Sequence, residues 1–393
     1  MGAIIVYRVG KEEAEAVSRV ILGGSYFKVN NIYGETEKAE NEMKELFGVK
    51  NALVMTSGMA ALVSGLTALG IGPGDQVIVP AYTYIATAMA VVAVGAIPVI
   101  AECDETLTVD PADLERKITG ATKAVIPVHI QGFPCDMDRI CAVAQKHGLK
   151  VVEDACQAVG GKYRGRRLGA IGDAGAFSFN QYKLISTGEG GALLTNDNSL
   201  YQRALIYHDS NAVVFFGDQM KNVTEKAFCG TEYRTNEIQT AMLRVQLGRM
   251  DGMIDDLRRI KKRIMEELKD KYRFIPSNDS DGDLSTTLAF AFGSAAEAEK
   301  FAAAKGGAIP INTGKHVYKN WTQIMEKRGA YHPLMDPFKM EANKGIVPDY
   351  REDMCPKTLD ILSRTVYVGL SPDMDDERVE AIIKECREIA ERM

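Results

Sequence analysis

Asp154 and Lys183 each have a reactive side chain, and the residues around each of them favour a catalytic role. Asp154 ends the apolar run 151–153, and a carboxylate at the end of a buried strand is costly unless a cation or hydrogen-bond donors contact it. Lys183 follows Phe177-Ser178-Phe179 and precedes the glycine-rich residues 187–191. A partly desolvated lysine amine is a good nucleophile and proton carrier. Each residue also has an ordinary explanation, because aspartates often cap helices and most lysines are solvated.

Three further stretches would complete a site for a planar, phosphorylated ligand. Residues 56–62 follow a predicted strand and open a helix, and the free backbone N–H groups at such a helix start form an anion site. The hydroxyl of Ser178 could donate a hydrogen bond to the same phosphate. Tyr84 could stack on a planar ring at the edge where open α/β sheets bind ligands. Each signal is weak alone, since many helices begin Ser-Gly and most tyrosines belong to the core or the surface.

An acid, a lysine, a stacking aromatic ring and an anion site together fit the cofactor pyridoxal 5′-phosphate (PLP). An aspartate beside the pyridine nitrogen of PLP keeps that nitrogen protonated, which strengthens the cofactor as an electron sink. A lysine amine condenses with carbonyl groups such as the aldehyde of PLP. We therefore predict that Asp154 and Lys183 act on one bound PLP.

The elements around these residues predict an α/β fold. Short apolar runs at residues 51–55, 77–79, 97–100, 124–128 and 151–153 alternate with helical stretches at 58–69, 84–94 and 137–147. This alternation indicates a largely parallel sheet with helices on both faces. The apolar runs 174–179 and 191–195 are too close together for a helix between them, so they predict a hairpin or an antiparallel edge.

The pattern changes after about residue 235. A long charged helix is predicted over residues 236–272, broken near Gly252, with Met242, Val245, Leu247 and Met250 on its apolar side. Strands at 287–292 and 366–370 and helices at 295–304 and 375–392 predict a smaller α+β unit. We place a large PLP-binding α/β domain with a helical N-terminal arm at residues 1–250, and the small domain at residues 251–393.

The composition indicates a soluble protein and argues against several partners. The 393 residues are 46% hydrophobic, and the net charge of −6 with scattered basic residues gives no footprint for nucleic acid or a membrane surface. The densest basic stretch, 164–167, predicts a hairpin turn with solvated arginines. Seven single cysteines favour reduced thiols in the cytoplasm over a metal site or disulfides. Residues 1–8 lack the features of a signal peptide, and the apolar stretch 86–100 is too short to span a bilayer.

Taken in order, the motifs resemble the DegT/DnrJ/EryC1/StrS family of PLP-dependent sugar aminotransferases. The similarity runs from about Gly24 to about Gly252 and more loosely to the C-terminus. Its most specific part is Glu153-Asp154-Ala155-Cys156-Gln157, followed by Phe177-Ser178-Phe179 and then by Lys183 with Gly188-Glu189-Gly190-Gly191.

This resemblance implies a fold type I enzyme with a mostly parallel seven-stranded sheet, and a homodimer whose active sites each borrow residues from the partner subunit. It also implies that Lys183 forms the Schiff base and carries a proton between Cα and C4′, while Asp154 pairs with the pyridine nitrogen. The other implied cofactor contacts are ring stacking by Tyr84, a contact near the phenolic oxygen by Gln157, and phosphate contacts by Gly58, Met59 and Ser178.

Two positions depart from the family pattern. The family has Asn two residues before the Arg of an Asn-x-Arg motif, where it reaches the partner's cofactor phosphate, but here Glu232 precedes Arg234. Because an ionised glutamate beside a phosphate is repelled, either Glu232 points elsewhere, or it pairs with a cation, or Asn236 supplies the contact. We include Asn236 among the predicted cofactor-binding residues. Met59 stands where Thr is common, which removes a hydroxyl and leaves the backbone donor.

The predicted activity is the transfer of an amino group from L-glutamate or L-glutamine to a keto-sugar or sugar-like acceptor. The acceptor is a nucleotide-linked keto-sugar, a keto-cyclitol or a keto-sugar acid, and the sequence does not decide among them. The region 315–321 holds the only tryptophan, Trp321, which belongs either to the core of the small domain or to the substrate site.

Four rival activities fit the sequence less well. A PLP-dependent sugar dehydratase would carry His in place of Lys183, and a cysteine desulfurase would carry His in place of Tyr182. A catalytically idle PLP-binding regulator would not need an intact Lys183, Asp154 and Gln157. A nicotinamide dehydrogenase would show G-x-G-x-x-G after the first strand of the α/β part, and this sequence does not.

Overall fold

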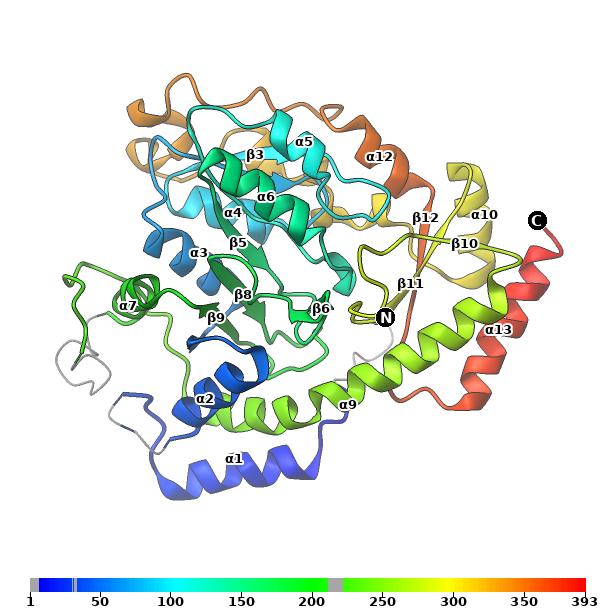
Figure 1. Cartoon of the computed structure of the whole chain (residues 1–393), viewed down its shortest axis with the longest axis horizontal. Helices are drawn as coiled ribbons and strands as arrows, with labels where there is room; N and C mark the ends of the chain where they lie inside the picture. Colours follow the sequence, from blue (N-terminus) through cyan, green and yellow to red (C-terminus); the bar gives the residue numbers. More distant parts are fainter. Residues whose placement is uncertain (1–6, 30, 32–33, 211–221) are drawn as a thin grey trace.

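A seven-stranded sheet forms the centre of the computed structural model, which describes residues 7–29, 31, 34–210 and 222–393 (Figure 1). Residues 1–6 of the stretch expected not to be a signal peptide lie outside the described residues. The strand order is β1-β9-β8-β5-β4-β2-β3, and only β9 runs against its neighbours. The strands are β1 Asn51–Met55, β2 Gln76–Pro80, β3 Ile97–Ala101, β4 Thr122–Val125, β5 Lys150–Asp154, β8 Ala174–Ser178 and β9 Gly191–Thr195.

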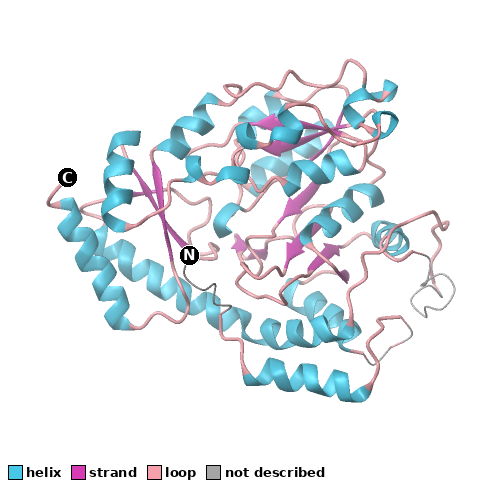
Figure 2. Ribbon diagram, turned by 180° about the vertical axis from the view of Figure 1, so that it is seen from behind, coloured by secondary structure: helices cyan, strands magenta, loops and turns pink. Residues whose placement is uncertain are grey.

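Helices cover both faces of this sheet, as Figure 2 shows. Alternate residues of one strand therefore enter different cores: Leu53 packs with one cluster and Val54 with the other. One core includes α3 (Gly58–Ala68), α4 (Ala86–Ala93) and α7 (Asn198–Tyr207). The other includes α2 (Glu35–Phe47), α5 (Pro111–Arg116), α6 (Met137–His147) and α9 (Glu237–Leu268). Burial on both faces explains why the strands are continuous runs of Val, Ile, Leu and Ala. The predicted α/β sheet and the antiparallel pairing of β8 with β9 are confirmed.

Helix α9 runs without a break past Gly252, so the predicted interruption there is wrong. Glycine inside a helix costs only about 1 kcal/mol, and the neighbouring Met250, Met253 and Ile254 are buried and hold the helix straight through this point. The helix also ends at Leu268, short of residue 272. On its predicted apolar side Leu247 and Met250 are buried, whereas Met242 and Val245 are half-buried.

The C-terminal part forms a smaller antiparallel sheet with order β10-β11-β12. Its core is aromatic, with Tyr272, Phe290 and Phe301 in mutual ring contact. Helix α9 links this unit to the large sheet, and α13 packs against α9 at its far end (Figure 1). The elements are β10 Arg273–Phe274, β11 Thr287–Ala291, β12 Thr365–Gly369, α10 Ala295–Lys305, α11 Thr322–Met325, α12 Pro356–Ser363 and α13 Asp376–Ala390.

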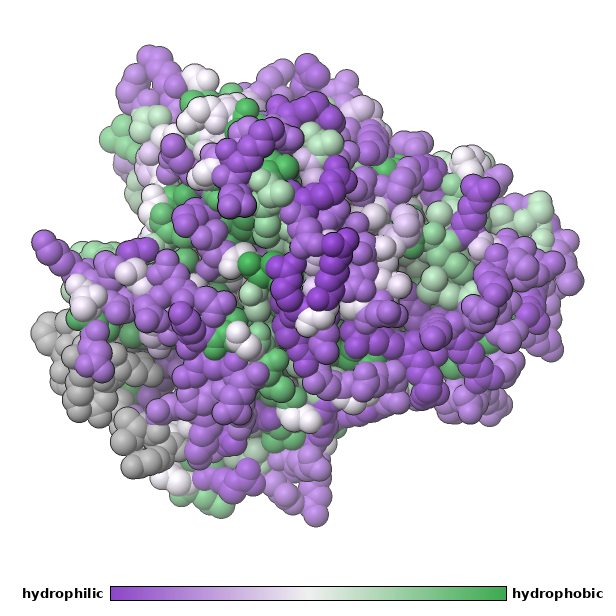
Figure 3. All heavy atoms as spheres, in the orientation of Figure 1, coloured by the Kyte–Doolittle hydropathy of each residue, from purple (hydrophilic) through white to green (hydrophobic). Residues whose placement is uncertain are grey.

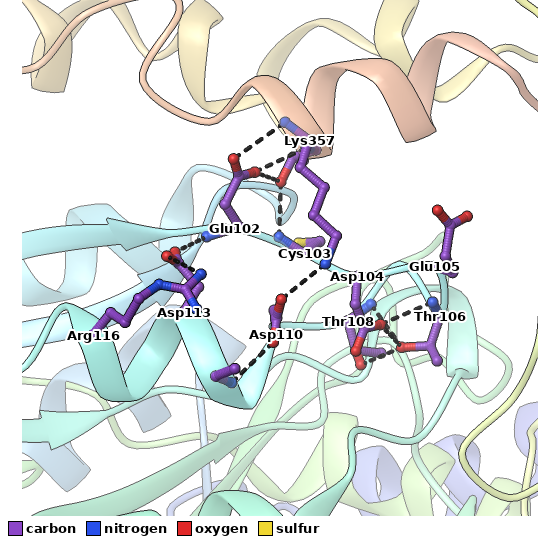
Figure 4. A network of polar contacts seen from close by, with 12 residues as sticks. Glu102, Cys103, Asp104, Glu105, Thr106, Thr108, Asp110, Asp113, Arg116 and Lys357 are labelled. Carbon is purple, nitrogen blue, oxygen red and sulfur yellow. Dashed lines mark hydrogen bonds and ion pairs between the residues drawn. The ribbon is translucent and has the colours of Figure 1, made fainter.

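A polar network joins α12 to the end of β3 (Figure 4). Glu102 accepts hydrogen bonds from the N–H groups of Lys357 and Thr358 at 3.2 and 2.8 Å, so it caps the start of α12 from outside the helix. The Thr358 hydroxyl in turn accepts from the N–H of Cys103 at 2.7 Å. These contacts fix the C-terminal part against the edge of the large sheet.

The N-terminal arm contains α1 (Lys11–Gly23) and packs along α9. Glu13 accepts hydrogen bonds from Gln246 and Arg249 at 2.6 Å each. After the arm, the buried ion pair of Lys28 with Glu40 at 2.7 Å anchors the chain to the sheet, since Glu40 also accepts from the N–H of Val54 at 3.0 Å.

The basic residues 164–167 lie in the predicted hairpin: residues 164–165 form the turn after β6 (Lys162–Tyr163), and the next two residues are β7 (Arg166–Arg167). Arg164 and Arg166 pair with Asp138 at this surface. Hydrophilic side chains cover most of the face drawn in Figure 3. No helix among the described residues has the length and apolar character needed to cross a bilayer.

Candidate functional site

A cavity of about 590 Å³ opens at the edge of the large sheet where β5 and β8 end. It collects seven of the eight residues predicted to bind the cofactor or to act on it: Gly58, Met59, Tyr84, Asp154, Gln157, Ser178 and Lys183. They come from segments up to 125 positions apart in the sequence, which the parallel strand order brings to one edge.

Asp154 stands at the end of β5 and is only 6% exposed. Its carboxylate accepts a hydrogen bond from the Thr87 hydroxyl at 2.8 Å and one from the N–H of Cys156 at 3.1 Å. In the described part of the chain we find no ion pair to Asp154. A buried carboxylate without a cation at the wall of a cavity is a binding feature for a cationic ligand group.

Lys183 enters the cavity from the turn that follows β8. The backbone of this turn is held by hydrogen bonds from Lys183 N–H to the Asn180 carbonyl at 2.9 Å and from Gln181 N–H to the Gly188 carbonyl at 3.0 Å. Gly188 has φ +81°, the left-handed conformation that favours glycine. The side-chain amine of Lys183 has no hydrogen bond or ion pair within the described residues, so it is available to a ligand.

The N-terminus of α3 forms another wall of the cavity. Ser57 caps this helix by accepting from the N–H of Ala60 at 3.1 Å. The N–H groups of Gly58 and Met59 have no partner among the described residues, and Ser178 lines the cavity beside them. A Cβ at Gly58 would lie 2.6 Å from the Cys156 sulfur and 2.9 Å from Ser178 Cβ. Only glycine therefore lets the helix start approach this closely, as an anion site requires.

Gln157 lines this cavity and also a second, adjoining chamber of about 410 Å³. The second chamber is bounded by Lys183 and His316 together with Gln131, Thr286 and Thr287 from the far side. The cofactor-sized cavity thus continues into a space whose walls carry hydroxyl and amide groups.

Tyr84 meets the residues of the loop before η5 (Tyr318–Asn320). Its ring lies 5.4 Å from the His316 ring, edge to face, and 4.8 Å from the Lys315 amine. Burial, and after it the positive charges of Lys183 and Lys315, lower the pKa of His316, while a hydrogen bond to the Thr313 carbonyl opposes the shift. His316 is therefore neutral near pH 7.

Trp321 is fully buried, and its ring N–H donates to the Lys315 carbonyl at 2.9 Å. Trp321 is a core residue, but the core it joins is the one that includes α3 and α4 and not the aromatic core of the small sheet, where the sequence placed it. The tryptophan nevertheless positions the loop that brings Lys315 and His316 to the cavity.

Asn236 lies outside the cavity of its own chain. Its side chain caps α9 by accepting from the N–H groups of Ile238 and Gln239 at 3.1 and 3.0 Å. Gln239 donates to the carbonyl of Glu189, a cavity residue, at 3.1 Å. The start of α9 is thus beside the cavity without entering it.

Glu232 pairs with a cation, which is one of the three predicted alternatives. Its carboxylate lies 2.6 Å from Arg234 and accepts from the Ser210 hydroxyl at 2.9 Å. Arg234 also pairs with the buried Asp209 at 2.6 Å and lies 4.9 Å from the ring of Phe27.

Sequence reasoning missed several residues of the cavity. Thr87 is buried and carries the hydroxyl that contacts Asp154, but a threonine near the start of a helix gives no signal of that role. Cys156 was noted only as part of a motif, yet its sulfur stands beside the cavity, where burial and the Asp154 charge raise the pKa of its thiol. The cavity is also lined by Asn180 and Glu189, which had no predicted role, and by Lys315 and His316 of the region 315–321.

The residue before Asp154 has a structural role. Glu153 is fully buried and accepts hydrogen bonds from the N–H groups of Gly169, Ile171 and Gly172 at 2.9, 2.6 and 2.7 Å. It also contacts His129 at 3.0 Å. The two consecutive acids therefore have different roles: Glu153 faces the protein interior, and Asp154 faces the cavity.

These features fit PLP. The uncompensated Asp154 suits a protonated pyridine nitrogen, the free N–H groups of α3 suit a phosphate, and the free Lys183 amine suits the aldehyde. When bound, PLP supplies the electron sink for reactions at an amino-acid Cα.

Comparison with known proteins identifies the family of the chain. The model of the DegT/DnrJ/EryC1/StrS aminotransferase family matches residues 8–320. A Bacillus subtilis relative, spore coat polysaccharide biosynthesis protein SpsC, is 33% identical over 97% of this chain and 95% of its own length. The dTDP-3-amino-3,6-dideoxy-alpha-D-galactopyranose transaminase of Aneurinibacillus thermoaerophilus is 37% identical over 70% of this chain and 73% of its own. Among solved structures, an aminotransferase from Psychrobacter cryohalolentis superposes with a TM-score of 0.81 at 27% identity, covering 98% of both chains.

Proposed function

Because the chain belongs to the DegT/DnrJ/EryC1/StrS aminotransferase family, we propose that it carries out its PLP-dependent transamination in the cavity at Lys183. One observation carries this assignment. Asp154 and Lys183, neither of which has an ion pair in the part of the chain that the structure describes, line the same cavity as the start of α3. The enzyme acts on keto-sugar or sugar-like acceptors in amino-sugar biosynthesis.

Each cavity residue has one task in this proposal. Lys183 holds the cofactor covalently and moves a proton between the substrate Cα and C4′ of the cofactor. Asp154 keeps the ring nitrogen protonated, and the contacts from Thr87 and Cys156 N–H hold that carboxylate in place. The phosphate is bound by Gly58, Met59 and Ser178, the ring is covered by Tyr84, and the phenolic oxygen is contacted by Gln157.

The substrates are an amino donor, L-glutamate or L-glutamine, and a keto-sugar. A relative named for a dTDP-linked amino sugar favours a nucleotide-linked acceptor, while a relative named for 2-deoxy-scyllo-inosose favours a keto-cyclitol. A keto-sugar acid also fits, because the exposed Lys315 at the cavity has no anionic partner among the described residues and suits an anionic acceptor, either a nucleotide-linked keto-sugar or a keto-sugar acid.

Three further features belong to the same proposal. The protein is a homodimer in which Asn236 and its surroundings serve the partner's cavity, as the position of the α9 start outside its own cavity allows. It works in the cytoplasm, in line with its seven free cysteines. The large domain spans residues 1–250 and the small one 251–393, with the boundary inside α9.

Borohydride reduction of the purified enzyme tests the site assignment. We expect a visible absorbance band that disappears on adding glutamate, and peptide mapping after reduction that labels Lys183. The Lys183→Ala variant should lose the label and the turnover. Lys315→Ala, which removes a second lysine from the same cavity, should keep the label. A label on any other lysine would overturn the assignment.

A further inference from the structure

Gln131 has a backbone conformation that residues other than glycine rarely adopt. Its φ is +52° and its ψ is 19°, which costs a non-glycine residue of the order of 1 kcal/mol or more. Ser285, in the segment that packs against it, is also left-handed with φ +66°. Strain of this kind persists only where surrounding contacts impose it, and it gathers at functional sites.

The contacts that impose it connect the two parts of the molecule. The carbonyl of Gln131 accepts from the Thr286 hydroxyl at 3.1 Å, and its side-chain Oε1 accepts from the Thr287 hydroxyl at 3.2 Å. Gly132 presses against Leu284, because a Cβ at position 132 would lie 2.4 Å from Leu284 Cβ. Gln131 is therefore held by the start of β11, in the C-terminal part.

The remaining contact of Gln131 points to the cofactor cavity. Its backbone N–H donates to Oε1 of Gln157 at 3.0 Å. A backbone N–H can only donate, so Gln157 must turn its oxygen toward Gln131 and its Nε2 away from it. We find no hydrogen bond to that Nε2 within the described residues, and Gln157 lines both chambers.

We propose that Gln131 is a positioning residue, which fixes the side-chain amide of Gln157 so that Nε2 donates to the phenolic oxygen of PLP. Thr286 and Thr287 hold Gln131 in the conformation that does this. The proposal rests on the function proposed above and adds the reason why Gln157 acts as a donor. It also links the placement of the C-terminal part to the charge on the cofactor ring.

The pH midpoint of the visible band of the PLP-loaded enzyme reports this hydrogen bond. When Nε2 no longer donates, the phenolic oxygen keeps more negative charge, and the proton it shares with the Lys183 nitrogen is held to a higher pH. Gln131→Val should raise the midpoint by about one pH unit, or about 1.4 kcal/mol, because a β-branched residue disfavours the left-handed conformation. Gln131→Asn should give a smaller shift than Gln131→Val, because asparagine tolerates that conformation, although its shorter side chain loses the contact with Thr287.

Thr287→Val gives a second test that leaves Gln131 itself in place. It removes the donor to Gln131 Oε1 at nearly constant shape and should raise the midpoint in the same direction by a smaller amount. Thr365→Val is the matched control, since Thr365 is also a buried threonine of the small sheet and donates to the Ile361 carbonyl at 2.7 Å. The charged residues of the cavity are unchanged in all these variants.

The outcomes separate this inference from the proposed function. A wild-type enzyme with no visible band that borohydride removes would refute the function itself. With that band present, wild-type midpoints in both Gln131→Val and Thr287→Val would overturn the role of Gln131. A shift in Thr365→Val equal to that in Thr287→Val would also overturn it, because any loss of packing would then suffice. If Gln131→Val does not fold, Thr287→Val decides alone.

Discussion

Within the described residues, the Asp154 carboxylate is contacted by two neutral donors, the Thr87 hydroxyl and the Cys156 N–H, and by no cation. A site built for stability would pair such a buried carboxylate with a cation. Here the ligand supplies the cation, so the Asp154 carboxylate is stabilised when PLP binds. The neighbouring Glu153 is also buried, but three backbone N–H groups of its own stabilise its carboxylate.

Asp154→Asn should lower kcat at least ~100-fold, roughly 2.7 kcal/mol of barrier. The amide keeps the shape and can still accept from the Cys156 N–H, but it no longer holds the pyridine nitrogen protonated. PLP should still bind, because the phosphate contacts at α3 and Ser178 remain. Steady-state kinetics with glutamate, together with PLP titration, measure both effects. Turnover within a few-fold of the wild type would assign Asp154 a purely structural role.

Among single residues, the sequence could predict those whose role follows from the residue type and from its place near the end of a predicted strand. Asp154 comes at the end of one predicted strand and Lys183 four residues after another, so both strands and the sheet edge that they share could be predicted. Thr87 and Gln131 could not be predicted, because their roles arise from contacts across 67 and 26 positions of sequence that no local pattern records.

At the scale of elements, residues 207–210 and 231–233 run side by side. The N–H of Thr231 donates to the Tyr207 carbonyl at 2.7 Å, and that of Tyr233 to the His208 carbonyl at 2.9 Å. The second segment then crosses the end of β1, where Thr56 N–H donates to the Tyr233 carbonyl at 3.0 Å. The ion pair of Glu232 with Arg234 thus lies in the segment that crosses the end of β1 and supports the start of α3.

Glu232→Asn should therefore change the PLP dissociation constant by no more than about twofold, because a half-exposed ion pair contributes little. Titration of the apoenzyme at fixed salt measures this. Glu225→Gln, which breaks the comparable pair of Glu225 with Arg203, serves as the control for losing a surface pair. Tightening by tenfold or more in Glu232→Asn alone would show that the glutamate repels a phosphate.

His208 follows the last residue of α7 and should make stability depend on pH. It is fully buried, and in the described part of the chain its Nε2 has no hydrogen-bond partner. Burial, and after it the positive charge of Lys28, lower its pKa well below the usual value. Below about pH 6.5 the unfolded state therefore binds a proton that the folded state does not, so stability is lost as pH falls. Urea unfolding at about pH 7.5 and about pH 5.5 should show a smaller loss in His208→Asn than in the wild type, by up to about 1.4 kcal/mol per pH unit.

The break predicted in α9 shows a limit of element prediction. Gly252 interrupts the local pattern, but the helix is stabilised by Leu257, Ile260 and Ile264 beyond it, which pack into the same core as the sheet. Tertiary packing outweighs a single unfavourable residue. The strands could be predicted more closely because burial on both faces makes each a continuous apolar run.

At the scale of the whole molecule, the sheet order explains why the site forms where it does. The parallel strands β2 and β5 deliver Tyr84 and Asp154 to the same edge, and the β8–β9 hairpin delivers Lys183 beside them. Length and alternation of elements could predict the sheet, but not which strands are neighbours. The C-terminal part then closes one side through Lys315 and His316.

One edge of the molecule is left with exposed apolar side chains. Ile21, Leu22, Tyr26 and Phe27, at the end of α1 and just after it, are 49, 87, 45 and 52% exposed. The arm that carries them packs along α9, whose first residues adjoin Glu189 of the cavity. A second copy of the chain that covered these side chains would bring its own arm near the site, as the proposed homodimer requires.

Leu22→Asp should therefore dissociate the dimer and weaken PLP binding together, because a charge buried in an apolar interface is strongly unfavourable. In a monomer the same change would have almost no effect, since Leu22 is 87% exposed and has little packing to lose. Leu334→Asp is the matched control, as Leu334 is 84% exposed but lies in the C-terminal part. Sedimentation velocity and PLP titration on both variants should show the two losses in Leu22→Asp alone. A wild-type enzyme that sediments as a fully active monomer would contradict the shared site, and loss of the dimer in Leu334→Asp instead would place the interface on the other side of the molecule.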